Sequence, residues 1–417
     1  ISACLVGSEM CIRDRSEHAP AGIWRQFLDA LREAGFEGEI DASYGTQTLF
    51  ATDNSLYQYP PKAVLFPRHA QDVQRVARLL GQDEYREVTL APRGGGTGTN
   101  GQSLTNGLVM DLSRHMNGIL EIDAAEGWVR VQAGVVKDQL NAALKPHGMF
   151  FAPELSTSNR ATLGGMINTD ASGQGSCTYG KTRNHVLGLD FVLLGGERFF
   201  SEAVDDAQLD TLCAGPGRVG RVYRTARRMA DEQADLIAAK FPKLNRCLTG
   251  YDLAHLREAD GRFNLNSVLC GAEGSLGFVV EARLNILPIP KYSVLVNVRY
   301  AAFMDALRDA RALIAQKPLS IETVDSKVLL LAMNDFVWNS VAEYFPASEG
   351  EPTLGINLVE FSGNDPAEVD ARVARFVQHL QTDTTVRRLG HTLAAGTDAV
   401  KRVYAMRKRA VGLLGNV

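Results

Sequence analysis

A run of glycines between residues 92 and 101, with the sequence PRGGGTGTNG, constrains the fold of this chain more than any other stretch. The apolar residues 88–91 before it predict a short buried strand, so the glycines form a loop at a strand end. Without side chains, consecutive backbone N–H groups can turn toward one anion. Arg93, Thr97 and Thr99 add charge and hydroxyl donors at the same place. The loop is therefore predicted to hold a phosphate or a pyrophosphate.

Part of this loop, residues 96–101, matches the dinucleotide-binding pattern G-x-G-x-x-G. That pattern identifies a Rossmann site only when a helix follows at once, because the helix N-terminus receives the pyrophosphate. Here residues 102–107 are turn formers, and residues 108–112 look like another strand. The sequence therefore disfavours a Rossmann NAD site.

A second match, residues 175–182 with the sequence GSCTYGKT, fits the phosphate-loop pattern GxxxxGK[ST]. Such a loop needs an apolar strand before it and a helix after it. Residues 168–174 are polar instead, and residues 186–194 are strand-like. We therefore expect no nucleotide hydrolysis that depends on Lys181.

Length and composition narrow the class of protein. With 417 residues, of which 45% are hydrophobic, the chain can form two or more domains. A net charge of −4 makes nucleic acid an improbable partner, and no apolar run approaches the roughly 20 residues that span a bilayer. The six cysteines are scattered without a C-x-x-C pair, which suits a reducing cytoplasm.

Both ends of the chain read as artificial. The sequence begins at Ile1, and residues 1–15 lack the features of a secretory signal, so we treat them as an artefact outside the fold. Residues 16–59 are predicted to form a helical extension, with Ile23, Phe27 and Leu31 at helical spacing and a polar, turn-rich part from residue 44. The chain stops at Val417 after an amphipathic stretch, and we expect it to be a fragment of a longer protein.

The remainder predicts two α+β domains. Residues 60–290 contain strands at 63–66, 108–112, 118–123 and 127–133, helices near 73–80 and 136–144, and a helix-rich insert at about 201–268. Residues 291–417 alternate strands and helices, which predicts a second α+β layer arrangement.

A polar segment at residues 153–180 is rich in Ser, Thr, Asn and Gly. So long a polar stretch in a compact domain is either a binding segment or a mobile surface loop. Leu163, Met166 and Ile167 would anchor it, and its small residues permit close approach of a ligand.

Three segments in this order carry a family resemblance: residues 92–101, residues 153–197 and residues 270–290. Together they resemble the FAD-binding domain of the vanillyl-alcohol-oxidase/PCMH superfamily of FAD-linked oxidases. The chain is most similar to the D-lactate, D-2-hydroxyglutarate and glycolate dehydrogenases. Among these it resembles the N-terminal part of large bacterial members that are fused to an iron–sulfur domain. The resemblance implies a PCMH-type FAD-binding domain of two α+β subdomains, followed by a truncated ferredoxin-like α+β substrate (cap) domain.

The resemblance also implies a set of FAD-binding residues. The main chain of the glycine loop would hold the pyrophosphate, residues of the polar segment would line the flavin and ribityl chain, and residues near 275 would close the adenine side. These residues are, in that order, Pro92, Arg93, Gly94, Gly95, Gly96, Thr97, Gly98 and Asn100; Ser158, Thr162, Gly164, Gly165, Asn168, Gly173 and Tyr179; Glu273, Gly274 and Gly277. Because no His stands beside the loop, we expect FAD to bind without a covalent bond.

Two features of the second domain concern the substrate. Residues 321–325, with the sequence IETVD, resemble the Glu-x-x-Asp segment of the family's cap domain, but a solvated strand end is an equal alternative. Arg407 stands where the family places an arginine that binds the substrate carboxylate, a task that suits its forked guanidinium. The alternative is that Arg407 belongs to a solvated helix face with Lys401, Arg402, Lys408 and Arg409.

From the resemblance we expect FAD-dependent oxidation of a D-2-hydroxy acid, with D-2-hydroxyglutarate favoured and D-lactate next. The Cα hydride would pass to the flavin while a base takes the hydroxyl proton. In relatives that base is a His, and a metal on His and Glu ligands can polarise the hydroxyl. Those motifs would lie beyond Val417, so no catalytic residue or metal ligand is assigned here, and weak FAD binding or incomplete turnover is expected.

Electrons would then pass to an iron–sulfur centre or a quinone-linked carrier, with a 4Fe-4S cluster expected only in the downstream region. The alternatives are an FAD oxidase that uses O₂ on an alcohol or sugar, and a non-catalytic FAD-binding subunit. We expect a protein in the cytoplasm or at the periphery of the inner membrane. The sequence gives no indication of its oligomeric state.

Overall fold

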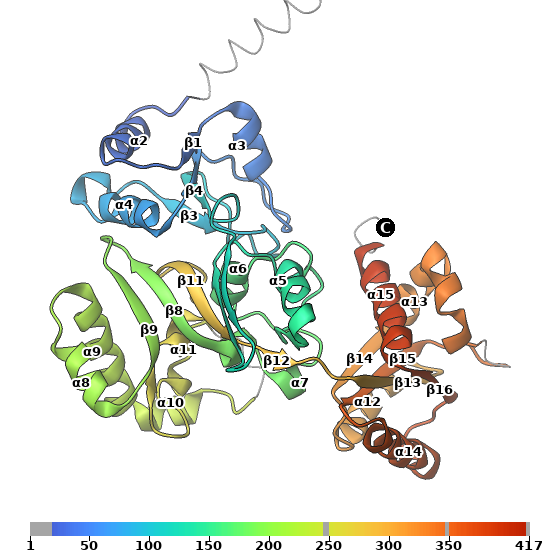
Figure 1. The fold of residues 1–417 in the computed structure, drawn as a ribbon. Coiled ribbons are helices and arrows are strands. Elements are labelled where there is room, and N and C mark those ends of the chain that lie inside the picture. Colours follow the sequence, from blue (N-terminus) through green and yellow to red (C-terminus); the bar gives the residue numbers. More distant parts are fainter. Residues whose placement is uncertain (1–18, 245–249, 347–349, 414–417) are drawn as a thin grey trace, which may run out of the picture. The chain divides into compact units, whose positions relative to one another are not determined.

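The computed structural model describes residues 19–244, 250–346 and 350–413, and these form two compact units (Figure 1). The first comprises the described residues of Ile1–Ser172 and Lys181–Leu287, and the second those of Gly173–Gly180 and Pro288–Val417. The chain therefore passes between the units three times, after Ser172, after Gly180 and after Leu287. The predicted artefact at residues 1–15 lies outside the described residues.

A small sheet near the start of the first unit carries the glycine loop. Its order is β1-β2-β4-β3, and β2, β4 and β3 run parallel, whereas β1 is antiparallel to β2. The bounds are β1 (Glu39–Asp41), β2 (Ala63–Phe66), β3 (Leu90–Arg93) and β4 (Leu108–Asp111). Strands β2 and β4 are entirely buried, which explains why both read as continuous apolar runs.

The N-terminal segment is less helical than the sequence predicts. Helix α2 (Ile23–Glu33) has the expected apolar stripe and packs against α4 (Ala70–Leu80), but β1 adds a strand to the small sheet. The stretch predicted to be turn-rich from residue 44 begins with a helix, α3 (Tyr44–Phe50), capped by the Ser43 hydroxyl, which accepts from the N–H of Thr46.

The large sheet of the first unit is antiparallel throughout, with the order β10-β9-β8-β11-β6-β5. Its strands are β5 (Ile119–Asp123), β6 (Trp128–Gln132), β8 (Val186–Leu193), β9 (Arg198–Val204), β10 (Phe263–Asn264) and β11 (Gly277–Asn285). Helix α4 packs against β8 and β11, and α6 (Leu163–Asn168) also contacts β11. The polar segment predicted as a loop is thus partly helical and rests on this sheet.

The remaining elements of the first unit are short or lie in the insert. They are α5 (Lys137–Leu144), β7 (Met149–Phe150), α8 (Asp206–Ala214), α9 (Gly217–Glu232), α10 (Ala234–Lys240) and α11 (Asn266–Leu269). The predicted insert is helix-rich, but it also supplies β10, which pairs with β9 at the edge of the large sheet. Among the described helices, none has both the length and the hydrophobicity to span a membrane.

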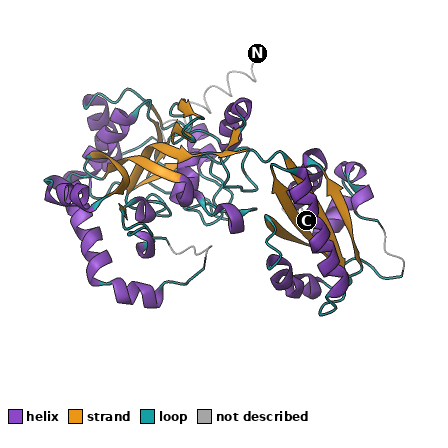
Figure 2. Ribbon diagram, turned by 60° about the horizontal axis from the view of Figure 1, so that its bottom comes forward, coloured by secondary structure: helices purple, strands orange, loops and turns teal. Residues whose placement is uncertain are grey.

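The second unit has a ferredoxin-like sheet. Its strands β13 (Tyr292–Tyr300), β14 (Ser320–Asp325), β15 (Gly355–Gly363) and β16 (Gly390–Ala395) are antiparallel in the order β14-β15-β13-β16. Helices cover both faces (Figure 2), which is why β13 and β15 are buried on both sides. Helices α12 (Phe303–Ile314) and α14 (Pro366–Thr382) pack on one face, and α13 (Ser326–Met333) and α15 (Thr397–Leu413) on the other. Strand β16 is not evident from the sequence. The short α7 (Ser176–Tyr179) also belongs to this unit, and β12 (Leu287–Pro288) stands at the junction.

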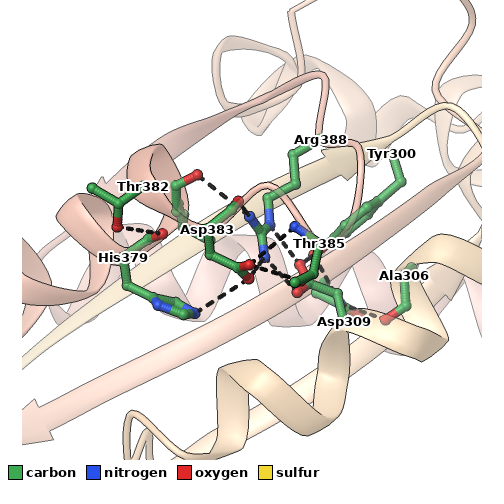
Figure 3. Close-up of polar contacts among 10 residues, drawn as sticks. Tyr300, Ala306, Asp309, His379, Thr382, Asp383, Thr385 and Arg388 are labelled. Atoms are coloured by element: carbon green, nitrogen blue, oxygen red, sulfur yellow. Dashed lines mark hydrogen bonds and ion pairs between the residues drawn. The ribbon is translucent and has the colours of Figure 1, made fainter.

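A buried ion network joins α12 to the segment before β16 (Figure 3). The fully buried carboxylate of Asp309 accepts two hydrogen bonds from the guanidinium of Arg388, at 2.7 and 2.6 Å, and one from the hydroxyl of Tyr300 at 2.6 Å. Arg388 also donates to Asp383 at 2.8 Å, which holds the pKa of that carboxyl well below its usual range. Every charge in the network has a partner. Removing one partner would leave a buried charge unpaired, and this costs more free energy of folding than the intact network contributes.

We therefore expect Arg388→Met to destabilise the second unit by about 3–5 kcal/mol, because Asp309 would stay buried without a counter-charge. Urea unfolding followed by Trp338, which stacks on Phe345 in this unit, measures the loss once Trp24 and Trp128 are replaced by Phe.

The neighbouring Arg387→Met is the matched control, since Arg387 is 68% exposed and a surface pair contributes under about 1 kcal/mol. Equal losses for the two variants would show that the network is not important for stability. The double variant Asp309→Leu/Arg388→Met should recover part of the loss.

Candidate cofactor and substrate sites

The glycine loop follows β3 directly, as predicted, and no helix comes between it and β4. Two main-chain bonds fix its path: Leu112 N donates to Arg93 O at 3.0 Å, and Asn54 N donates to Gly96 O at 3.1 Å. The Rossmann arrangement is therefore absent from this part of the described chain, and any anion held here must be bound by the loop itself.

The main-chain N–H groups of residues 94–99 are available to a ligand. No described residue accepts a hydrogen bond from any of them, and Gly96 has a φ of 59° in the left-handed region. Consecutive free N–H groups with an alternating backbone hand form an anion-binding concavity, and no helix dipole is required. This is the feature that the sequence predicts for a pyrophosphate.

The loop lies directly against the polar segment, which leaves no room for side chains on it. A Cβ at Gly95 would stand 2.1 Å from the carbonyl oxygen of Arg160, and one at Gly94 would stand 2.0 Å from the hydroxyl oxygen of Thr162. Thr162 in turn caps α6, because its hydroxyl accepts from Gly165 N at 3.3 Å. Bare main chain at residues 94 and 95 is thus a packing requirement as well as a property of the anion site.

A hollow of about 270 Å³ opens between this loop, α6 and the turn at residues 273–274. Most of the residues predicted to bind FAD line it: Pro92, Arg93, Gly94, Gly95, Gly96, Thr97, Gly98, Thr162, Gly164, Gly165, Asn168, Glu273 and Gly274. The structure therefore brings together in one hollow residues from all three segments of the predicted site.

Asn168 holds two walls of the hollow together. Its side-chain amide donates to Gly164 O at 2.8 Å, its side-chain oxygen accepts from Gly274 N at 3.1 Å, and its carbonyl accepts from Glu273 N at 2.8 Å. Glu273 adopts a φ of 51°, which is rare for a residue other than glycine. Because the walls are bonded to each other, the hollow exists before any ligand binds.

Arg93 has a role that the sequence does not reveal. Its guanidinium donates to Phe50 O at 3.2 Å and to Thr52 O at 2.8 Å, and it lies 5.1 Å from the centre of the Phe50 ring. The side chain therefore fastens the turn after α3 to the loop, and its positive charge adds to the field of the anion site from behind.

Five residues predicted to bind FAD lie outside this hollow. Asn100 is exposed, and Ser158 is buried and donates to Asp138 at 3.1 Å. Gly277 lines a second hollow of about 370 Å³, which shares Gly274 with the first. Gly173 and Tyr179 belong to the second unit.

Other residues line the first hollow without having been predicted: Thr99, Gln102, Ser103, Leu112, Ala133, Leu155, Thr157, Ala161, Met166, Thr169 and Ala171. Only Thr99 had a sequence signal, as a donor in the glycine loop. Apart from Gln102, the rest are small or apolar residues, and the residue types say nothing of a ligand, so only the fold could reveal them.

The phosphate-loop match at residues 175–182 is occupied by structural contacts. Lys181 is buried and forms an ion pair with Asp170 at 2.5 Å, and the hydroxyl of Thr182 donates to Ala171 O at 2.7 Å. A lysine held in this way is not free to reach a nucleotide phosphate.

In the second unit, Arg407 is paired rather than solvated. Its guanidinium donates to Glu322 of β14 at 2.5 Å, with side-chain exposures of 27% for Arg407 and 17% for Glu322. The IETVD segment and Arg407, which the sequence presents as two separate features, are therefore in direct contact. The exposed members of the alternative face are elsewhere on α15, and Arg409 pairs with Asp335 at 2.6 Å.

A second polar group lies on the same face of the sheet as Glu322, at the next cross-strand pair on that face. Glu360 on β15, opposite Ser320 in register, is 8% exposed and accepts at one oxygen from Tyr404, Ser320 and Gln174. Burial raises the pKa of Glu360 above its usual value. No sequence pattern selects this residue. Among the described residues, no group of three or more His, Cys, Asp or Glu side chains could hold a metal.

Two family models match the chain. The FAD binding domain matches residues 61–199, and the C-terminal domain of FAD linked oxidases matches residues 289–417. These matches coincide with the glycine loop, the polar segment and α15.

Curated relatives are similar over nearly all of this chain. D-2-hydroxyglutarate dehydrogenase from Pseudomonas putida is 72% identical over 406 residues, which cover 97% of this chain and 40% of that protein. The Escherichia coli protein of the same name is 51% identical over 394 residues, covering 94% of this chain and 39% of that one. The chain thus spans about 40% of the length of these relatives.

Among solved structures, an alkyldihydroxyacetonephosphate synthase has the same fold, with a TM-score of 0.64, 17% identity, and coverage of 93% of this chain and 64% of that one. With the sequence matches, the prediction of the family and of the α+β fold class is confirmed. The chain belongs to the FAD-linked oxidases, with an FAD-binding domain and an FAD-linked oxidase C-terminal domain.

Proposed function

We propose that this chain is the FAD- and substrate-binding part of a dehydrogenase that oxidises a D-2-hydroxy acid, with D-2-hydroxyglutarate as the favoured substrate and D-lactate next. The observation that carries the proposal is the row of free N–H groups at residues 94–99 beside a preformed hollow. The names of the curated relatives at 72% and 51% identity support the choice of substrate.

The residues present fit FAD. The free N–H groups of the loop would receive the pyrophosphate, and Arg93 would add charge behind it. The first hollow would take the adjoining part of the cofactor, and the second hollow, which shares the lining residue Gly274 with the first, would take the adenine side. When bound, the flavin supplies a two-electron acceptor for the hydride of the substrate Cα. Because the sequence beside the glycine loop contains Thr97 and no His, the cofactor would be held without a covalent bond.

Arg407 would bind the carboxylate of the substrate. Its fork is engaged by Glu322 in the structure, so an incoming carboxylate would share the guanidinium or take the place of Glu322. The pair is already neutral, which means that Arg407 by itself offers little net charge to a dicarboxylate. We infer that a further cation, from the part of the relatives that this chain does not span, completes the site.

The proton acceptor and the route of the electrons belong to the same proposal. No described cluster could hold a metal, and we assign the base and any metal ligands to the downstream region of the relatives. Electrons would leave the flavin for an iron–sulfur centre or a quinone-linked carrier of the cytoplasm or inner membrane surface.

The cofactor site is tested by Gly95→Ala. A Cβ at 2.1 Å from Arg160 O cannot be accommodated without moving main chain, and such overpacking should weaken FAD binding about tenfold or more. Titration of the apoprotein, followed by quenching of FAD fluorescence, gives the affinity.

Gly45→Ala is the matched control, because a Cβ there meets nothing within 4 Å. If Gly95→Ala bound FAD as tightly as Gly45→Ala did, the loop would not be the cofactor site. A protein that takes up no FAD at all, even when extended by the downstream region of the Pseudomonas putida relative, would refute the proposed function.

The substrate site is tested in that extended protein by Arg407→Lys, which keeps the charge but loses the fork. We expect the KM for D-2-hydroxyglutarate to rise roughly a hundredfold, equivalent to losing about two charge-assisted hydrogen bonds, with FAD content unchanged. Anaerobic bleaching of the flavin by D-2-hydroxyglutarate, D-lactate and glycolate measures the effect and ranks the substrates.

Lys401→Met, which removes an exposed charge from the same helix, is the control and should leave the KM unchanged. Equal effects of the two variants would mean that Arg407 is part of a solvated face. Rapid peroxide formation in air would favour an oxidase, and absence of bleaching by any of the three acids would favour a non-catalytic subunit.

A further inference from the structure

Glu360 is a nearly buried carboxylate with an unusual set of partners. One of its oxygens accepts from the hydroxyl of Tyr404 at 2.9 Å, the hydroxyl of Ser320 at 3.3 Å and the amide of Gln174 at 3.4 Å. All three donors are neutral, and no described Lys, Arg or His forms an ion pair with it.

Such an arrangement is expensive for the fold. Moving a carboxylate out of water without a counter-charge costs more free energy than neutral hydrogen bonds contribute. For this reason burial raises the pKa of Glu360. A leucine or methionine would pack at this position at lower cost. Stability therefore does not explain the residue, and its connections need another reason.

The three donors come from three separate parts of the chain: helix α15, strand β14 and the excursion at residues 173–180. The excursion has further bonds to the same sheet end. Among these, the hydroxyl of Thr178 donates to Leu319 O at 3.0 Å, next to Ser320 at the start of β14. Glu360 is thus the group at which the excursion and α15 meet.

Both of these parts lead directly to a candidate site. Tyr404 precedes Arg407 by one helical turn on α15, so the two side chains share a face. In the other direction, Gln174 follows Ala171 by three residues, and Asn168, Thr169 and Ala171 line the cofactor hollow. The ion pair of Lys181 with Asp170 closes the base of the excursion, so the ends of the excursion cannot move independently.

We propose that Glu360 is a positioning residue that fastens the excursion 173–180 to helix α15, so that occupation of Arg407 is transmitted along the chain to residues 168–171 of the cofactor hollow. The transmission rests on the proposed function, since it needs an anion at Arg407 and FAD at the hollow. The attachment of the excursion to α15 through Glu360 does not depend on the proposed function.

The fastening is tested by hydrogen exchange without any ligand. The amides of Ser176, Thr178, Tyr179 and Gly180 are bonded inside the excursion and report its order. Glu360→Ala and, from the other side of the same bond, Gln174→Ala should speed their exchange about tenfold, as expected for the loss of a hydrogen bond. Amides of α12, on the opposite face of the sheet, should not change.

Glu368→Gln, an exposed carboxylate at the start of α14, is the control. If exchange in the excursion is the same in Gln174→Ala and in this control, Glu360 does not hold the excursion and the proposal is wrong. Emission of Trp338 shows whether each variant is folded, and a Glu360→Ala chain that does not fold leaves Gln174→Ala to decide.

Transmission is tested in the FAD-loaded extended protein with 2-oxoglutarate, the product of the favoured substrate, which binds without turnover. The visible flavin spectrum of the unaltered protein should shift on titration. In Gln174→Ala the amplitude of the shift should fall by half or more while the affinity for 2-oxoglutarate is kept, because Arg407 is intact. An unchanged amplitude refutes transmission through the excursion. If the unaltered protein binds FAD but shows no shift, the proposed substrate is wrong, and the exchange result then decides the role of Glu360 by itself.

The charge of Glu360 gives a third readout. The pKa of Glu360 is higher in the folded protein than in the unfolded chain. Glu360 therefore contributes to the stability of the fold when pH is below its unfolded-state pKa, and this contribution is lost as pH rises through its folded-state pKa. Glu360→Gln should therefore shift the urea midpoint upward by an amount that grows as pH rises above 4.5. The ionisable groups nearest to it, Tyr404, Tyr179 and the Glu322–Arg407 pair, remain in both proteins and cancel in the comparison. A constant difference at all pH values would show that the charge of Glu360 is not felt at this junction.

Discussion

Close approach of two stretches of main chain governs the first unit of this protein. The glycine loop at residues 94–99 lies so near to residues 160–162 that a single methyl group at Gly94 or Gly95 would overlap with them. Because the glycines here have no side chains, a row of N–H groups is left without an acceptor among the described residues, which is costly unless a ligand or water accepts their hydrogen bonds. Packing and binding therefore impose the same residue type at the same positions, and the cofactor site cannot vary without the fold.

The second unit follows a different rule, in which charges are matched inside the protein. Arg388 is saturated by Asp309 and Asp383, and Arg407 is neutralised by Glu322. All the charges of the Arg388 network are used to hold α12 against the segment before β16. Arg407 is half-buried and has one partner, and in the proposed function that partner gives way to a substrate carboxylate. Glu360 is the exception to the rule, since its partners are all neutral, and for that reason it stands out as a residue with a role beyond stability.

How much the sequence could predict depends on the range of the interactions. The glycine loop, the strand at 63–66 and the two α+β domains were evident from local composition and periodicity. Arg93 could not be understood in this way, because its acceptors are carbonyls more than forty residues earlier. Strand β16 was missed because five of its six residues face solvent or are half-buried in an irregular pattern. Glu360 was missed because a single Glu in an apolar strand is defined only by what surrounds it.

The placement of Gly173 and Tyr179 shows the same limit more sharply. The family resemblance puts them among the residues of the predicted cofactor segment, and the structure assigns them to the second unit. Nothing in the residues from 170 to 182 marks the two crossings. They are defined by tertiary bonds, those of Lys181 to Asp170 on one side and of Thr178 to Leu319 O on the other.

The interrupted course of the chain limits how this architecture could be cut or recombined. A gene fragment that encodes residues 288–417 alone would lack the eight residues that contact the end of its own sheet. Exchange of this domain between relatives therefore requires two grafts rather than one. If this domain binds the substrate as proposed, substrate preference should change by substitution within the domain more readily than by replacement of the whole domain.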